Sequence, residues 1–153
     1  MKDLNKNDDE QGGYDLIVLG AGSAGFSAAI TGADAGKRVA LVGHGTIGGT
    51  CVNVGCVPSK AMIRAAEAVH CAGAAKRFPG LSGRAQVDDW QTLVQSKDDL
   101  VTTLRQKKYA DLLPEYEDVD YIDAGPARLI EGGVTVGERT LKAPRTIIAT
   151  GGR

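Results

Sequence analysis

The 153-residue sequence lacks several features that would place it in a large class of proteins at once. Its formal net charge is only −1, so it offers no electrostatic attraction to nucleic acid or to an anionic membrane surface. No apolar run approaches the roughly 18 residues that a membrane helix needs, and the N-terminus has no signal-peptide core. Three cysteines do not make a secreted disulfide scaffold. These absences predict a soluble, cytoplasmic protein whose cysteines serve catalytic or redox chemistry.

Glycine, in contrast, is present in excess. The 21 glycines are about twice the usual share of roughly 7%, and many are grouped, as expected of loops that approach a ligand closely. Residues 1–13 are polar, contain almost nothing to bury and predict a flexible leader. Residues 14–153 predict one domain, because this length is enough for a sizeable core.

A strand, a helix and a second strand are predicted in succession over residues 14–19, 24–35 and 38–42. The first turn of this unit carries the motif G-x-G-x-x-G at Gly20, Gly22 and Gly25. The first glycine allows a tight turn, the second lets the backbone approach a pyrophosphate, and the third lets the helix pack closely on the strand. The phosphates then face the N–H groups at the positive end of the helix dipole. The unit predicts a dinucleotide site rather than a merely structural glycine turn.

One part of that dinucleotide motif is missing. An acidic residue that binds a ribose hydroxyl is expected at the end of the second strand, about 20 residues beyond the glycine turn. Gly43 and then His44 occupy this place, and no carboxylate lies nearby in the sequence. Either the backbone or His44 takes over the ribose contact, or the adenosine end binds more loosely. An ordinary surface histidine is the alternative interpretation of His44.

The rest of the chain predicts two helices followed by short strands. The first helix covers residues 61–75, and its apolar residues at helical spacing would face the core: Met62, Ile63, Ala66 and Val69. The second begins at the N-cap pair Asp88-Asp89 and runs to about Leu113, with an apolar face formed by Trp90, Leu93, Val94, Val101 and Leu104. Its basic residues, Lys97, Arg105, Lys107 and Lys108, are interpreted as a solvated face. Strands separated by glycine turns are predicted over residues 119–124, 127–130, 134–136, 139–142 and 146–149. The buried-type last strand has no helix after it, which predicts a truncated domain.

Cys51 and Cys56 are separated by five positions. Five residues of helix span about 7.5 Å along the axis, whereas a disulfide requires Cα atoms about 4.4–6.8 Å apart. The two can join only if the first helical turn is distorted or Cys51 precedes the helix, and Gly55 gives the backbone that freedom. A thiolate is favoured near a helix N-terminus with Lys60 close by. We interpret the two cysteines as a redox pair; a small stapling disulfide and half of a metal site are the alternatives. Cys71 has no partner in the sequence and is interpreted as a packed or incidental thiol.

The stretch from Gly45 to Lys60 resembles the active-site signature of the FAD-dependent pyridine nucleotide–disulfide oxidoreductases. The resemblance covers about residues 14–153, and within the family this stretch and Met62–Ala66 are most similar to the mercuric reductases. It implies a Rossmann-like FAD-binding domain in which Cys56 contacts the flavin and Cys51 faces the substrate. The FAD-binding residues implied by the motif and the resemblance are Gly20, Gly22, Ser23, Ala24, Gly25, Gly43, His44, Gly45, Gly49, Thr50, Lys60, Ala127, Thr150 and Gly151.

The resemblance also implies an enzyme. NAD(P)H would reduce FAD, FAD would reduce the Cys51–Cys56 disulfide, and the electrons would convert Hg(II), bound transiently by the two cysteines, to Hg(0). A dihydrolipoamide dehydrogenase-like enzyme that acts on a small disulfide or dithiol, and a non-catalytic FAD- or metal-binding fragment, are the alternatives. The sequence has no second G-x-G-x-x-G for NAD(P)H and no C-terminal dimerisation domain of this family. We therefore expect the full-length enzyme to be a homodimer and this chain alone to be inactive.

Overall fold

The computed structural model describes residues 13–152, so the predicted leader lies outside the described residues except for Gly13. The described chain divides into two compact units. The first combines the described residues up to Gly49 with those from Lys107 onward, and the second runs from Thr50 to Gln106. The first unit contains the sheets, and the second is built from helices and the segments that join them.

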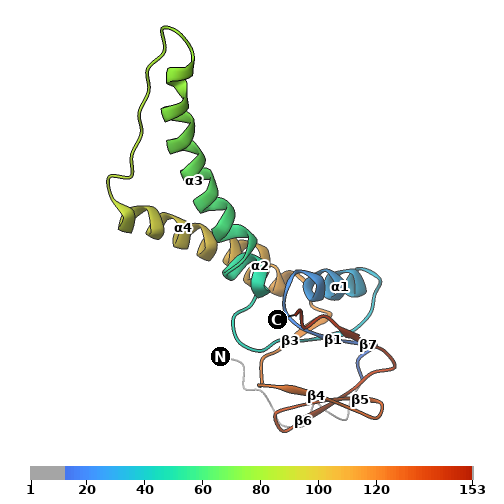
Figure 1. Cartoon of the computed structure of the whole chain (residues 1–153). Coiled ribbons are helices and arrows are strands. Elements are labelled where there is room, and N and C mark those ends of the chain that lie inside the picture. Colours follow the sequence, from blue (N-terminus) through green and yellow to red (C-terminus); the bar gives the residue numbers. More distant parts are fainter. Residues whose placement is uncertain (1–12, 153) are drawn as a thin grey trace. The chain divides into compact units, whose positions relative to one another are not determined.

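The first unit is built on a four-stranded parallel sheet (Figure 1). Its strands, in spatial order, are β3 (Val119–Ile122), β2 (Val39–Val42), β1 (Leu16–Leu19) and β7 (Thr146–Ile148). Helix α1 (Ser23–Asp34) connects β1 to β2, and the chain leaves it at Gly36, whose φ is +68°. The predicted strand–helix–strand unit is confirmed, with boundaries that differ by a residue or two.

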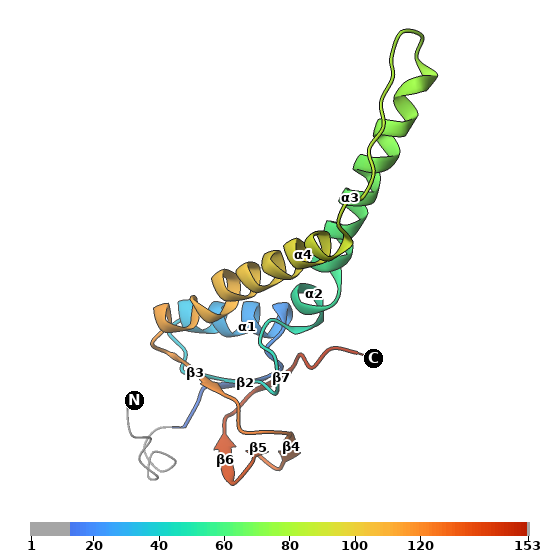
Figure 2. The same ribbon diagram turned by 90° about the vertical axis from the view of Figure 1, so that its left-hand side faces the viewer.

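Burial on both faces explains the continuous apolar runs of β1 and β2. Helix α1 covers one face of the parallel sheet, and Gly32 lets it approach closely, since a Cβ atom there would lie 2.9 Å from Val39 Cγ2. A three-stranded antiparallel meander covers the other face (Figure 2): β4 (Ala127–Ile130), β5 (Gly133–Val136) and β6 (Arg139–Lys142). The core between the sheets consists of Ile17, Leu19, Ala40, Val42, Ile122, Val134, Val136 and Leu141. The predicted fold class, an α/β parallel sheet with helices and a small antiparallel meander, is confirmed.

The last strand differs from its prediction. Ile147 and Ile148 of β7 are 40% and 62% exposed, although their apolar sequence predicted a buried strand. Strand β7 is the edge of the parallel sheet and pairs with β1 alone, so neighbouring strands do not enclose its side chains as they enclose those of β1.

The second unit begins with the short helix α2, which runs from Gly49 to Asn53. Helix α3 (Cys56–Ala74) follows, continues into a 3-10 turn at Ala75–Arg77, and is succeeded by α4 (Trp90–Arg105). Asp89 caps α4 as predicted, because its Oδ1 accepts hydrogen bonds from the N–H groups of Gln91 and Thr92 at 2.9 and 3.2 Å. Within residues 13–152, no helix is both long and apolar enough to cross a membrane.

The apolar faces predicted for these helices are confirmed only in part: Met62, Val69, Leu93, Val94 and Leu104 are half-buried. No residue of α3 is buried, and Ile63 is 55% exposed, because α3 packs in its unit against another helix and not on a sheet. Trp90 of α4 is 61% exposed, whereas Val101 is buried as predicted. The helix also ends earlier than predicted: a π-helical turn at Gln106–Ala110 follows Arg105, and Pro114 lies in a separate 3-10 turn, Leu113–Glu115.

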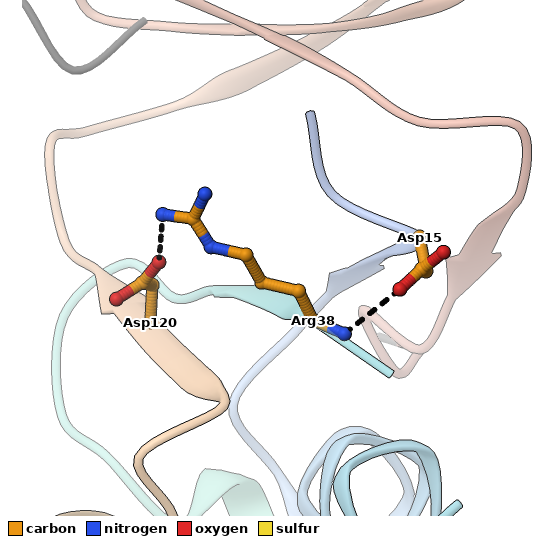
Figure 3. A network of polar contacts seen from close by, with 3 residues as sticks. All are labelled: Asp15, Arg38 and Asp120. Carbon is orange, nitrogen blue, oxygen red and sulfur yellow. Dashed lines mark hydrogen bonds and ion pairs between the residues drawn. The ribbon is translucent and has the colours of Figure 1, made fainter. Parts of the chain in front are cut away.

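A polar cluster joins the amino ends of β1, β2 and β3 (Figure 3). The Arg38 guanidinium pairs with Asp120 at 3.2 Å, and the Arg38 N–H donates to Asp15 Oδ2 at 3.0 Å. The same guanidinium lies 4.9 Å from the ring centre of Tyr14. Burial, and next the hydrogen bond to Asp120, raise the pKa of Tyr14. This cluster lies at the opposite end of the strands from the loops that follow β1 and β2.

Candidate functional site

The glycine motif lies at the carboxyl edge of the parallel sheet. The chain leaves β1 toward β2 on one side, while β7 lies on the other side, so the strand order reverses beside β1. Ligands of open parallel sheets bind in the crevice outside such a switch point. The segments after β1, β2 and β7 contain most of the residues predicted to bind a dinucleotide.

Two glycines of the motif are required by close backbone contacts. A Cβ atom on Gly20, whose φ is +114°, would lie 2.2 Å from the Ala149 carbonyl oxygen, and one on Gly25 would lie 1.7 Å from the Gly20 oxygen. The Ala149 N–H donates to the Leu19 carbonyl at 2.7 Å, so the chain leaves β7 directly beside the turn. The structure therefore brings the predicted residues Thr150 and Gly151 next to the glycine motif.

The segment after β2 folds against the same turn. The Gly48 N–H donates to the Ala21 carbonyl at 2.8 Å, and a Cβ atom on Gly49 would lie 2.8 Å from the Gly22 Cα. Gly43 is buried, and the predicted residues His44 and Gly45 that follow it are exposed. Ala127 is the first residue of β4 and pairs with Val136 in the meander, five positions after β3 ends.

The N-terminus of α1 follows the glycine turn at this edge of the sheet and has no side-chain cap. Gly22 is the N-cap residue, and the first turn contains no acidic side chain. The first N–H groups of a helix have no partner within the helix, so they are available, together with the positive end of its dipole, to an anion. Ser23 and Ala24 are exposed at this position. The turn has no room for a Cβ atom at Gly20 or Gly25, and no side chain caps its N–H groups. It therefore fits the pyrophosphate of a dinucleotide.

Tyr109 contacts the start of α1, and the sequence did not predict this contact. Its hydroxyl shares a hydrogen bond of 2.9 Å with Ser23 Oγ, and its ring packs edge-on against Phe26 with centroids 4.8 Å apart. Tyr109 lies in the π-helical turn, inside what the sequence predicted to be a continuous helix. No sequence motif identifies Tyr109, so its contact with Ser23 is visible only in the structure.

The two cysteines of the signature are brought together in the second unit. Cys51 lies in α2 and Cys56 is the first residue of α3, so Cys51 precedes the regular helix, as the sequence argument required. The Gly55 N–H donates to the Thr50 carbonyl at 2.7 Å, and a Cβ atom on Gly55 would lie 2.9 Å from that oxygen. This tight turn places the Cys56 thiol within hydrogen-bond reach of Cys51. Both are exposed free thiols, and so is Cys71 in α3.

The pKa of Cys51 is raised, a direction opposite to the one that favours a thiolate at this residue. The hydrogen bond with the Cys56 thiol is the main cause that raises the pKa of Cys51 above its usual value, with further contributions from partial desolvation and the charge of Cys56. The Cys56 N–H and the positive charge of Lys60 act in the opposite direction and are outweighed. The contact with Cys56 therefore favours the protonated form of Cys51.

The remaining predicted residues of the second unit are Thr50 and Lys60, and both are exposed. Arg105 was interpreted as part of a solvated face, but its Nη1 donates to Asn53 Oδ1 at 3.1 Å and thereby ties the end of α4 to α2. Within residues 13–152, no group of three or more His, Cys, Asp or Glu side chains could hold a metal ion. Cys51 and Cys56 are thus at most a two-ligand site.

Several known proteins resemble this chain in sequence or in fold. The chain is 46% identical over 145 residues to a mercuric reductase of Streptomyces lividans, covering 91% of this chain and 30% of that protein. It is 44% identical over 139 residues to a mercuric reductase of Lysinibacillus sphaericus, covering 90% of this chain and 25% of that protein. The solved structure of the HOCl-induced flavoprotein disulfide reductase RclA from Escherichia coli is 31% identical, with a TM-score of 0.69 over 92% of this chain and 28% of that one.

The chain thus spans less than a third of each of these relatives. The family model described as pyridine nucleotide-disulphide oxidoreductase matches residues 14–153, which include the glycine turn, both cysteines and the segment that follows β7. The chain belongs to the pyridine nucleotide-disulphide oxidoreductase family.

Proposed function

We propose that this chain is the FAD-binding and dithiol part of a flavoprotein that reduces Hg(II). The observation that carries the proposal is the tight turn at Gly55, which brings Cys51 in α2 close to Cys56 at the start of α3. Both thiols are exposed. A disulfide that only stabilises the fold does not need exposure, whereas a redox pair must be reached by its electron donor and its substrate. Membership of the family and similarity to mercuric reductases support the proposal.

In this proposal, the backbone around Gly20, Gly22 and Gly25 and the N-terminus of α1 hold the FAD pyrophosphate. Other residues assigned to FAD binding are Ser23, Ala24, Gly43, His44, Gly45, Gly49, Thr50, Lys60, Ala127, Thr150 and Gly151. The FAD, when bound, supplies a carrier that takes up and releases an electron pair. A side chain at Gly20 or Gly25 would collide with the backbone of Ala149 or of Gly20 and so distort the turn proposed to hold the pyrophosphate.

The chemistry of the chain itself is the cycle of Cys51 and Cys56. Their disulfide takes up two electrons and two protons and becomes two thiols, and the reverse reaction returns the electrons. We assign Cys56 to the flavin side and Cys51 to the substrate side. In the reduced pair, the hydrogen bond with Cys56 raises the pKa of Cys51 and so favours its protonated form.

Hg(II) is the proposed substrate because soft thiolate ligands suit a soft metal ion, and two neighbouring thiols offer two of them. Reduction of Hg(II) to Hg(0) consumes two electrons, which NAD(P)H supplies in the whole enzyme. The whole enzyme is proposed to be a cytoplasmic homodimer.

Binding of FAD to the chain is the first test. The chain titrated into FAD should quench the flavin fluorescence and remain yellow after gel filtration. Gly25→Ala should abolish binding if the folded protein is retained, as circular dichroism would show, and Gly73→Ala, within α3 and with open space around its Cβ, serves as a matched control. A chain that folds but leaves FAD fluorescence unchanged would contradict the cofactor assignment.

Activity is tested in the longest protein expressed from the natural gene. Hg(II)-dependent oxidation of NADPH should be lost in Cys51→Ala and in Cys56→Ala, and retained in Cys71→Ala, which removes the third exposed thiol. NADPH oxidation that is indifferent to Hg(II) in the unmodified protein would contradict the proposed substrate.

A further inference from the structure

The place expected to hold a ribose-binding acid is filled by another side chain. Gly43 follows β2, where parallel dinucleotide-binding sheets carry a carboxylate. A Cβ atom on Gly43 would lie 2.5 Å from the hydroxyl oxygen of Tyr121, 2.8 Å from its Cε2 and 2.9 Å from the Ala21 Cβ. An acid therefore does not fit at this position unless Tyr121 moves. The phenol lies where the Cβ atom of an acidic residue at this position would need room.

The sheet register explains how Tyr121 reaches this position. Tyr121 of β3 pairs with Leu41 of β2, and the Gly43 N–H donates to the Ile122 carbonyl at 2.9 Å. The side chain of Tyr121 therefore extends along the end of β2 toward Gly43 and toward Ala21 of the glycine turn. Its hydroxyl lies beside the same turn that is proposed to hold the pyrophosphate.

The protonation and the hydrogen bonding of the Tyr121 hydroxyl both suit a contact with a ribose. Tyr121 is half-buried, and within residues 13–152 its hydroxyl makes no hydrogen bond. Burial, with a smaller contribution from the charge of Asp123, raises the pKa of Tyr121 above its usual value of 10.0. At neutral pH the group is thus an uncharged phenol that can both donate and accept a hydrogen bond. His44, the other candidate for this contact, is exposed beyond the buried Gly43.

We propose that Tyr121 is a ribose-binding residue, whose hydroxyl bonds a hydroxyl group of the adenosine ribose in place of the missing acid. The inference rests on the proposed FAD site. Gly43 and Tyr121 act as a pair, since the glycine provides the space that the phenol fills.

The test compares two ligands that differ only in the ribose hydroxyls. ADP and 2′,3′-dideoxy-ADP are titrated into the chain by calorimetry, with FAD titrated separately by fluorescence. A single net hydrogen bond predicts that the chain binds ADP about threefold to tenfold more tightly than the dideoxy analogue. Tyr121→Phe should bind the two equally. Tyr14→Phe removes the hydroxyl of another half-buried tyrosine, at the amino ends of the strands, and should keep the preference.

The outcomes separate the inference from the proposed function. Binding of FAD without a preference for ADP in the unmodified chain would overturn the role of Tyr121 and leave the FAD site intact. A preference for ADP that survives in Tyr121→Phe would also overturn the role of Tyr121. If that preference is lost in His44→Ala, His44 makes the ribose contact instead. If neither FAD nor ADP binds, both the inference and the proposed cofactor site fail. The comparison of ligands on the unmodified chain does not depend on the folding of any variant.

Discussion

The hydroxyl groups of Ser23 and Tyr109 share a hydrogen bond of 2.9 Å although 86 positions separate them in the sequence. Ser23 is the first residue of α1, at the N-terminus proposed to hold the pyrophosphate, and Tyr109 lies in the π-helical turn that follows α4. The bond therefore joins the start of the glycine-turn helix to a distant segment of the chain. Phe26, one turn further along α1, packs edge-on against the same tyrosine.

Removing the Tyr109 hydroxyl should lower the stability of the chain. Tyr109→Phe retains the ring contact with Phe26 and loses the hydrogen bond, which predicts a decrease of about 1 kcal/mol in the free energy of unfolding. Urea denaturation of Tyr109→Phe, Ser23→Ala and the double variant measures the effect. The double variant should lose less than the sum of the two single losses, because both single variants break the same bond. Strict additivity would show that the bond does not contribute to stability.

The reactivity of Cys51 should depend on Cys56 through pH. In the reduced chain, the rate of Cys51 alkylation should reach half its maximum above pH 9.0, the ordinary value of the thiol, because the hydrogen bond with Cys56 raises the pKa of Cys51. Cys56→Ala removes this bond and should lower the midpoint. Lys60→Met should raise the midpoint slightly, since the charge of Lys60 lowers the pKa of Cys51. Peptide mass mapping separates Cys51 from the other thiols, and a midpoint unchanged in Cys56→Ala would refute the coupling.

The raised pKa of Cys51 also predicts how the stability of the reduced chain changes with pH. A group whose pKa is raised in the folded state binds its proton more tightly there than in the unfolded chain. The contribution of Cys51 is therefore fully present below about pH 9.0 and is lost as the pH rises through the folded-state value. Denaturation curves of the reduced chain against those of Cys51→Ala should diverge below this pH and converge above it.

Gly55 should control the redox pair without being reactive itself. In Gly55→Ala the new Cβ would lie 2.9 Å from the Thr50 oxygen, so the turn must open and the disulfide becomes harder to form. A strain of about 1 kcal/mol corresponds to a reduction potential about 20 mV less negative. Gly73→Ala, in the same unit, meets no atom within 4 Å and should leave the potential unchanged while stabilising α3 by up to about 1 kcal/mol. Equal potentials in the two variants would contradict the role of the turn.

Arg38 should contribute to the free energy of unfolding and not to the affinity for FAD. Its ion pair with Asp120 has side chains that are 42% and 46% exposed, so solvent screening limits the pair to about 0.2–1 kcal/mol. Contact with the Tyr14 ring adds about 0.5 kcal/mol. Arg38→Ala should lower the unfolding free energy by about 1 kcal/mol, part of which disappears at high salt. FAD affinity should be unchanged, because Arg38 lies at the amino ends of the strands, and a weaker affinity would show that the two edges of the sheet are coupled.

Local patterns were sufficient to predict the sheets. The continuous apolar runs of β1 and β2, the glycine motif between them, and the glycine turns of the meander each reflect a contact made within a few residues or a burial on both faces. The position of Cys51 before the helix also followed from distance alone, since five helical residues are too long for a disulfide.

Long-range contacts were not predictable in this way. The apolar stripe of α3 suggested a core position, but periodicity records which residues share a face and not whether anything covers that face. Arg105 and Tyr109 looked like surface or helix residues because their partners, Asn53 and Ser23, are far away in the sequence. The missing acid at Gly43 was visible in the sequence, whereas Tyr121, which occupies its space, belongs to a strand paired only in the fold.

Anaerobic reductive titration of the FAD-loaded chain tests the central claim most directly. After mild oxidation to form the Cys51–Cys56 disulfide, the chain should take up about four reducing equivalents per bound FAD, two for the flavin and two for the disulfide. The Cys51→Ala variant, with Cys71→Ala in both proteins to exclude the third thiol, should take up about two. Uptake of about two equivalents by both proteins, despite bound FAD, would contradict the account of Cys51 and Cys56 as a redox pair.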